Sequence, residues 1–202
     1  MEWPKPVDEF DSDSPITRSL RAAASEEISL DECVLTGYDL NDSEGVVGRI
    51  EDPIAGRPAL GETSDGQWIM QPVGRRWDMA AQNPASGETL AYYRGRLLRS
   101  GGTIELADDR DFDLRRDLLR PSRWRILDPN RDLLAVLRSR PGGGALGMIS
   151  SRRARPRQRR IAISVAVDPR TEEHLGLLVL FACYVVLVVE TTRGYRPGGG
   201  DS

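Results

Sequence analysis

The most constraining feature of the sequence is an uninterrupted apolar run, Leu175–Val189, near its C-terminal end. Fifteen residues are too many for an ordinary strand, so the run predicts a helix, which we place at residues 172–190. The acids Glu172 and Glu173 suit the positive end of the helix dipole. A helix that is apolar on every side must be surrounded by apolar material, which only a protein core or a bilayer provides.

These two environments differ in the helix length that they require. Fifteen residues at about 1.5 Å each span roughly 22 Å, whereas the hydrocarbon layer is about 30 Å thick, so the length favours a helix buried in a protein core. The alternative is a C-terminal single-pass membrane anchor with a cytoplasmic β-domain. Seven arginines lie between residues 152 and 170, and only Arg193 and Arg196 follow the run, a charge pattern that such an anchor accepts. Tyr184 needs a hydroxyl partner in either environment.

Residues 46–167 have the pattern of an antiparallel β-domain. Short apolar runs alternate with turn signals such as Asp65-Gly66, Asn83-Pro84 and Asp128-Pro129, which is typical of a barrel or a sandwich. Apolar and polar residues alternate clearly in Ile161–Val167, as in a strand with one face on a core. We expect strands near Val46–Ile50, Gln67–Val73, Trp77–Gln82, Thr89–Arg96, Thr103–Leu106, Phe112–Arg116, Trp124–Leu127, Leu133–Arg138 and Arg160–Val167.

By composition the chain divides into three parts. Residues 1–20 are acidic and rich in Pro, Ser and Asp, with little to bury. Residues 21–45 are ambiguous, because a short helix could form at Arg21–Ile28 but Ser and Gly soon interrupt the pattern. We expect residues 1–45 to be largely disordered. The β-domain occupies residues 46–193, and residues 194–202 form a flexible tail. The segments that begin at Trp77 and Trp124 each read as a strand, a tight turn and a second strand, which indicates one hairpin used twice.

The chain resembles the tubby-like superfamily in three features. These are the two hairpins, the alternating strand and turn Ile161–Pro169, and the apolar run Leu175–Val189. The relevant branches are the LURP-one-related and phospholipid scramblase-like proteins, and the resemblance spans residues 46–190. It implies a mainly β fold in which a closed antiparallel β-barrel surrounds a hydrophobic C-terminal helix. It also implies binding of anionic phosphoinositide headgroups by basic side chains and, in the scramblase branch, a link to calcium and lipid movement.

The chain departs from the scramblase branch in two respects. It has only two cysteines, Cys33 and Cys183, and therefore no cysteine-rich palmitoylation segment. Asp168, Glu172 and Glu173 do not have the spacing of a calcium loop. These acids are better explained as a helix cap and first-turn charges.

No segment carries a recognisable catalytic motif, so we predict a protein that is not an enzyme and uses no cofactor or metal. The sequence lacks the G-x-S-x-G of a nucleophile elbow and the Lys-Ser/Thr of a phosphate-binding loop. His174 is its single histidine, which excludes most histidine-based triads and metal sites. The carboxylates of Asp108–Asp113 could hold a cation, but their spacing favours the solvent-exposed face of a strand.

The best candidate for a binding function is an arginine-rich segment, residues 152–160, which contains no acid. A guanidinium binds phosphate through two parallel contacts, so the segment predicts binding of an anionic phospholipid or a protein partner. A solvated loop, nucleic acid and the protein's own acidic N-terminal residues are the alternatives. The absence of interleaved aromatic residues argues against nucleic acid. The candidate binding residues are Arg152, Arg153, Arg155, Arg157, Arg159 and Arg160.

The N-terminal residues Met1–Pro4 contain no basic start followed by an apolar stretch. This pattern predicts a cytoplasmic location, with membrane association if the arginines bind lipid. The formal net charge is −3, which argues against a general binder of anionic surfaces. An anionic partner must therefore be recognised by a local cluster of basic side chains.

Overall fold

The structure, a computed structural model, describes Ile16 and residues 28–32, 37–51, 57–74, 77–96, 101–141, 159–165 and 173–194. In this part of the chain the fold is mainly β, with an antiparallel sheet and one helix. The strands are β1 (Ile28–Glu32), β2 (Gly37–Asn41), β3 (Val46–Glu51), β4 (Ala59–Thr63), β5 (Gly66–Pro72), β6 (Met79–Gln82), β7 (Thr89–Gly95), β8 (Gly101–Leu106), β9 (Asp111–Arg116), β10 (Arg123–Leu127), β11 (Leu133–Pro141) and β12 (Arg159–Val165), and the helix is α2 (Leu175–Gly194).

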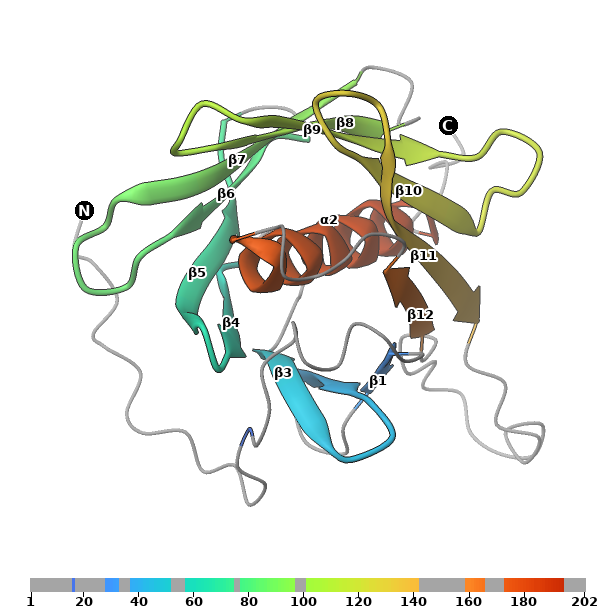
Figure 1. Cartoon of the computed structure of the whole chain (residues 1–202), viewed down its shortest axis with the longest axis horizontal. Coiled ribbons are helices and arrows are strands. Elements are labelled where there is room, and N and C mark those ends of the chain that lie inside the picture. Colours follow the sequence, from blue (N-terminus) through green and yellow to red (C-terminus); the bar gives the residue numbers. More distant parts are fainter. Residues whose placement is uncertain are drawn as a thin grey trace, which may run out of the picture.

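Each strand pairs antiparallel with its neighbours in the sequence. Strand β1 also pairs with β12, with Ile28 opposite Ile163 and Leu30 opposite Ile161. The sheet curves around α2, which lies within that curve (Figure 1). The helix contacts β3, β4, β5, β7 and β11, so strands from both halves of the sheet cover it.

The apolar run is buried in the protein core, as its length favours. All residues from Leu175 to Glu190 are buried, and Trp124 from β10, Tyr93 from β7 and Phe112 from β9 complete the core around them. Of the two environments considered from the sequence, the structure shows the first. Within the described residues, no helix combines the length and the apolarity needed to cross a membrane.

Two polar side chains of α2 lie inside the core, Tyr184 and Cys183. The hydroxyl of Tyr184 donates a hydrogen bond to the backbone carbonyl of Arg57 at 3.4 Å, which is the kind of partner expected from the sequence. Cys183 is fully buried, and desolvation raises the pKa of its thiol. Because the thiolate is the nucleophilic form, Cys183 is chemically inert at neutral pH.

Three strands were not predicted. Strands β1 and β2 lie inside residues 1–45, so the prediction that this segment is largely disordered is wrong for residues 28–32 and 37–41. Ile28 in β1 and Leu40 in β2 are apolar and fully buried. One face of a strand in this sheet must pack on the core, even where many of the strand's residues are acidic. The third, β4, was missed because its inner face contains Gly61, whose lack of a side chain hides the alternation. A Cβ there would lie 2.9 Å from Leu180 Cδ2.

The remaining predicted strands correspond to β3 and β5–β12, with small differences at their ends. Strand β6 begins at Met79 rather than Trp77, and α2 begins at Leu175 rather than at residue 172. The helix starts later because its first described backbone bond runs from the N–H of Leu178 to the carbonyl of His174, at 2.9 Å. The predicted repeat is confirmed as a pair of hairpins, β6–β7 and β10–β11.

A third hairpin, β2–β3, shares their geometry. In each of the three, the register shifts beside the turn, leaving one extra residue on the second strand: Val47, Leu90 or Leu134. A polar side chain then opens the turn by accepting hydrogen bonds from backbone N–H groups two to four residues ahead. An extra residue of this kind bends and twists a strand. The residues that open these turns are Asp42, Asn83 and Asp128.

The turns fall into two groups because consecutive strands run in opposite directions. Turns from an even-numbered strand to the next odd-numbered one lie at the end of the sheet where α2 begins. We call this the acidic end, and it comprises residues 42–45, 64–65, 83–88, 107–110, 128–132 and 173–174. We call the opposite end the arginine end. It contains the β9–β10 turn, residues 117–122, and the adjoining ends of β10, β11 and β12.

Candidate anion-binding site

The two ends carry opposite charge. At the acidic end the described residues include only two arginines, Arg110 and Arg131, against nine acids. At the arginine end, the β9–β10 turn and the adjoining strand positions carry Arg120, Arg123 and Arg138 against the single acid Asp117. This distribution complements the dipole of α2, whose positive end lies among the acids. The nine acids are Asp42, Glu44, Asp65, Glu88, Asp108, Asp109, Asp128, Asp132 and Glu173.

A pocket of about 350 Å³ opens at the arginine end, lined by Arg120, Ser122, Arg123 and Arg138. Arg123 on β10 lies opposite Arg138 on β11 in the strand register, and the turn brings Arg120 and Ser122 to the same place. The Nε atom of Arg123 is buried and has no hydrogen-bond partner among the described residues. A buried charged donor without a partner is costly, so an acceptor that reached this atom would offset that cost.

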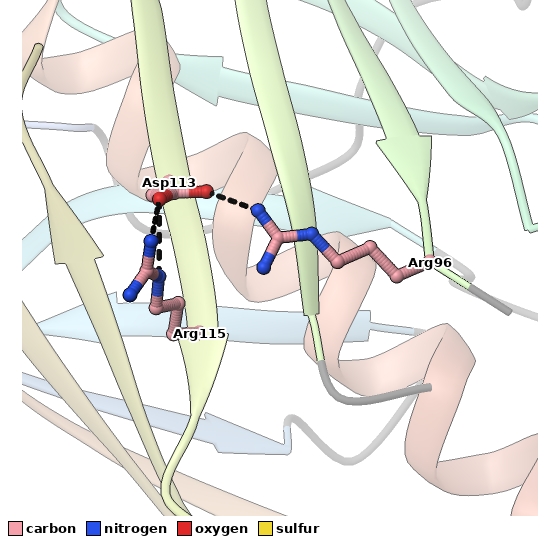
Figure 2. A network of polar contacts seen from close by, with 3 residues as sticks. All are labelled: Arg96, Asp113 and Arg115. Carbon is pink, nitrogen blue, oxygen red and sulfur yellow. Dashed lines mark hydrogen bonds and ion pairs between the residues drawn. The ribbon is translucent and has the colours of Figure 1, made fainter. Parts of the chain in front are cut away.

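Several arginines elsewhere in the described part of the chain are paired with acids. Figure 2 shows one such group, in which Asp113 of β9 accepts hydrogen bonds from Arg96, at 2.8 Å, and from Arg115. Arg49 is paired with Asp39 at 2.6 Å in the same way. Within the part of the chain that the structure describes, no ion pair joins a carboxylate to Arg120, Arg123 or Arg138. The three pocket arginines are therefore not neutralised by a carboxylate of the described residues.

The β9–β10 turn that presents Arg120 is well anchored. The carboxylate of Asp117 accepts hydrogen bonds from the backbone N–H of Leu119 at 3.0 Å and of Arg120 at 3.3 Å, and from Arg125 Nη2 at 2.9 Å. Burial acts to raise the pKa of the Asp117 carboxyl, but these hydrogen bonds outweigh it and lower the pKa. Asp117 is therefore an anion committed to holding the turn, so it does not compete for the pocket arginines.

A second set of contacts fixes the strands beneath the pocket to the helix. Glu190 of α2 is buried and accepts hydrogen bonds from Trp124 Nε1 at 3.1 Å and from Ser139 Oγ at 2.7 Å. The guanidinium of Arg116 lies over the Trp124 ring, 5.7 Å from its centroid, and one of its nitrogens is 4.0 Å from Glu190. Trp124 and Ser139 each adjoin a pocket-lining arginine in sequence, so the pocket is built on a rigid support.

A larger pocket, of about 650 Å³, lies at the acidic end. One of its acids, Asp108, is already paired: its Oδ2 lies 2.7 Å from Arg110 Nε and 3.5 Å from His174 Nε2. Burial acts to raise the pKa of Asp108, but the hydrogen bonds and charge of Arg110 outweigh it and lower the pKa. No group of three or more potential metal ligands occurs among the described residues. The lining residues are Asp65, Trp68, Leu90, Leu106, Ala107, Asp108, Glu173, His174 and Leu177.

The arginine-rich segment predicted from the sequence lies only partly within the described residues. Arg152, Arg153, Arg155 and Arg157 fall outside them, whereas the backbones of Arg159 and Arg160 belong to β12. There Arg160 lies opposite Arg140, two residues beyond the pocket residue Arg138. The two strand positions that flank residues 142–158 therefore lie at the arginine end.

Sequence reasoning missed Arg120, Arg123 and Arg138, although a signal for them was present. In a chain of consecutive antiparallel strands, the connections after β9 and after β11 must lie at the same end of the sheet. The strands predicted from the sequence already had this order. Arg120 and the arginine-rich segment could therefore have been placed together from the strand order alone.

No protein-family model matches the chain, and no curated protein and no solved structure matches it either. The candidate site therefore rests on its geometry and chemistry.

Proposed function

We propose that the protein is a non-enzymatic binding domain whose arginine end binds the phosphate of anionic phospholipid headgroups. The observation that carries this proposal is the buried, unpartnered Nε of Arg123 in a pocket between Arg120 and Arg138. A phosphate oxygen accepts from guanidinium nitrogens through two parallel contacts. A single phosphate would thus supply the missing acceptor and offset the repulsion among three neighbouring cations.

The arginine-rich segment extends this proposed site. Arg152, Arg153, Arg155 and Arg157 belong to a connection whose two flanking strand positions, Pro141 and Arg159, lie beside the pocket. Each basic side chain near an anionic membrane contributes about 1 kcal/mol to binding. The cytoplasmic leaflet is the natural source of such lipids, so the proposal includes a cytoplasmic location with reversible membrane association.

The proposal also includes the architecture. We infer that the sheet acts as a closed barrel of the tubby-like type, with α2 as its central helix. The pairing of β1 with both β2 and β12 and the burial of Leu175–Glu190 support this. Closure matters for function because it holds β10 and β11, and with them Arg123 and Arg138, in one fixed position. Slow amide hydrogen exchange across the β1–β12 pair tests it.

Co-sedimentation with lipid vesicles tests the proposed function. The wild-type chain should bind vesicles of phosphatidylcholine with phosphatidylserine and not vesicles of phosphatidylcholine alone. Replacing all three pocket arginines with glutamine (R120Q/R123Q/R138Q) should weaken binding roughly a hundredfold, since each charge contributes about 1 kcal/mol. The matched control is Arg94→Gln, which removes an exposed arginine that is paired with Glu105 and should change binding little.

Two further results would decide the ligand. Competition by soluble glycerophosphate at similar phosphate concentration would identify a free phosphate ester, rather than a membrane surface, as the ligand. Equal binding to neutral and anionic vesicles, or binding unchanged in the triple variant, would contradict the proposal.

A further inference from the structure

Two leucines in the β9–β10 turn are almost fully exposed. Leu118 is 87% exposed and Leu119 is 92% exposed, the two largest apolar exposures among the described residues. Single exposed leucines are common on protein surfaces. Two adjacent ones at the tip of a turn form an apolar projection, which lies next to the arginine pocket because Arg120 follows directly in the sequence.

The projection is held in its exposed position rather than left free to fold back. The N–H of Leu119 donates to the Asp117 carboxylate, and the N–H of Arg123 donates to the carbonyl of Arg120 at 2.8 Å. Arg116 Nε donates to the carbonyl of Pro121 from the other side of the turn. The N–H of Ser139 in the neighbouring strand binds the carbonyl of Ser122 at 2.8 Å. These contacts fix the turn backbone with both leucines pointing away from the core.

The charges around the projection select its partner. Asp117, the acid of the turn, is neutralised by Arg125, whereas Arg120, Arg123 and Arg138 have no ion pair in the described part of the chain. An apolar tip surrounded by cations is complementary to the surface of an anionic bilayer, where negative headgroups lie above hydrocarbon. An acidic protein groove would offer the negative charge without the uniform apolar layer beneath it.

We propose that Leu118 and Leu119 insert into the hydrocarbon boundary of an anionic membrane while the pocket arginines bind the headgroups above. This inference rests on the proposed function for the headgroup contacts and adds an apolar anchor to it. The anchor sets the orientation of the protein, with the arginine end facing the membrane and the acidic end facing away. Repulsion between the acidic end and the anionic surface reinforces this orientation.

The test compares leucine variants at the two ends in vesicle binding. Replacing both tip leucines (L118S/L119S) should weaken binding to phosphatidylserine-containing vesicles at least about tenfold, because two apolar side chains no longer leave water. The control is Leu133→Ser, which changes a 36% exposed leucine at the start of β11, beside the acidic end, and should leave binding unchanged. Leu118 and Leu119 are almost fully exposed, so the melting temperature of L118S/L119S should equal that of the wild type, whereas Leu133→Ser should lower it because Leu133 is partly buried.

A fluorescent probe reports insertion directly. An environment-sensitive fluorophore attached to a cysteine at position 118 (L118C in a C33S background) should shift its emission to shorter wavelength on anionic vesicles. Cys183 is buried and does not react. The same fluorophore at position 130 of the acidic end (N130C) should show no shift.

The outcomes show whether headgroup binding, insertion or both must be rejected. If the arginine triple variant loses binding while L118S/L119S binds normally and the probe does not shift, headgroup binding stands and insertion is overturned. If the wild-type chain ignores anionic vesicles, both proposals fall. If light scattering shows dimers that L118S/L119S abolishes, the leucines contact a second copy of the chain, and the membrane anchor is rejected.

Discussion

The two ends of the sheet handle charge in opposite ways. At the acidic end Asp108 is satisfied by Arg110 and lies near His174. At the arginine end the Nε of Arg123 has no hydrogen-bond partner among the described residues. Both ends belong to the same sheet, so the difference in hydrogen bonding does not come from the fold. A buried polar group that has all its hydrogen-bond partners stabilises the structure. A buried donor without an acceptor is a position where a ligand would supply the missing hydrogen bond.

Glycine substitutions should show that the start of β8, at the arginine end, is packed more tightly than the β6–β7 turn at the acidic end. Gly101 has a φ of 128°, and a Cβ there would lie 1.9 Å from the carbonyl oxygen of Leu114. Gly101→Ala should therefore lower the free energy of unfolding by at least about 3 kcal/mol, from overpacking and backbone strain together. Chemical denaturation measures this.

The control is Gly87→Ala at the acidic end. Gly87 has a φ of 72°, but nothing lies within 4 Å of its would-be Cβ. Only the backbone strain of about 1 kcal/mol should appear. Equal decreases in the free energy of unfolding for the two variants would show that packing does not distinguish the two positions.

Removing one guanidinium from each end should change stability with opposite sign. Arg123→Gln deletes an unpartnered buried donor, so without ligand it should raise the free energy of unfolding by about 1 kcal/mol. Arg110→Gln at the acidic end removes the partner of Asp108 and should lower it, by less than about 1 kcal/mol because the pair is partly exposed. Thermal unfolding without lipid measures both, and a loss of stability in Arg123→Gln would mean that Arg123 has a structural partner.

The smallest expected effect is a dependence of the free energy of unfolding on pH below about pH 4, which originates from Asp108 at the acidic end. The native pKa of Asp108 is lowered, so its contribution to stability is fully present above the unfolded pKa of about 4 and is lost as pH falls through the native value. Asp108→Asn should therefore flatten the decline in stability below about pH 4. Asp109→Asn, which removes a carboxylate from the same turn, serves as the control in an acid titration of the melting temperature, and identical profiles would exclude Asp108 as a source.

Much of the fold followed from two patterns in the sequence. The length and uniform apolarity of Leu175–Val189 predicted a buried helix. Short apolar runs between turn signals located β3 and β5–β12, with clear alternation in β8, β9, β10 and β12. Strands β1 and β2 were not predicted, because their core residues Ile28 and Leu40 lie among acidic residues that suggest disorder. Local pattern cannot reveal them, since their stability comes from pairing with β12, which is distant in the sequence, and with β3.

The candidate site was predicted only in kind. The predicted segment and the pocket share a residue type, arginine, and the backbones of Arg159 and Arg160 lie at the same end of the sheet as the pocket. The binding role of the segment stays a prediction. Arg123 could not be singled out from its sequence, because its distinguishing property is a missing partner. Whether a guanidinium is paired depends on which carboxylates the strand register brings opposite, as Asp113 shows for Arg96 and Arg115 (Figure 2).

The register shifts in β2–β3, β6–β7 and β10–β11 recur at intervals of four strands. An extra residue of this kind bends and twists a strand, so the sheet bends at three regularly spaced places. Most residues of the turns beside these bends are exposed. Loops inserted there should therefore leave the buried contacts of α2 unchanged.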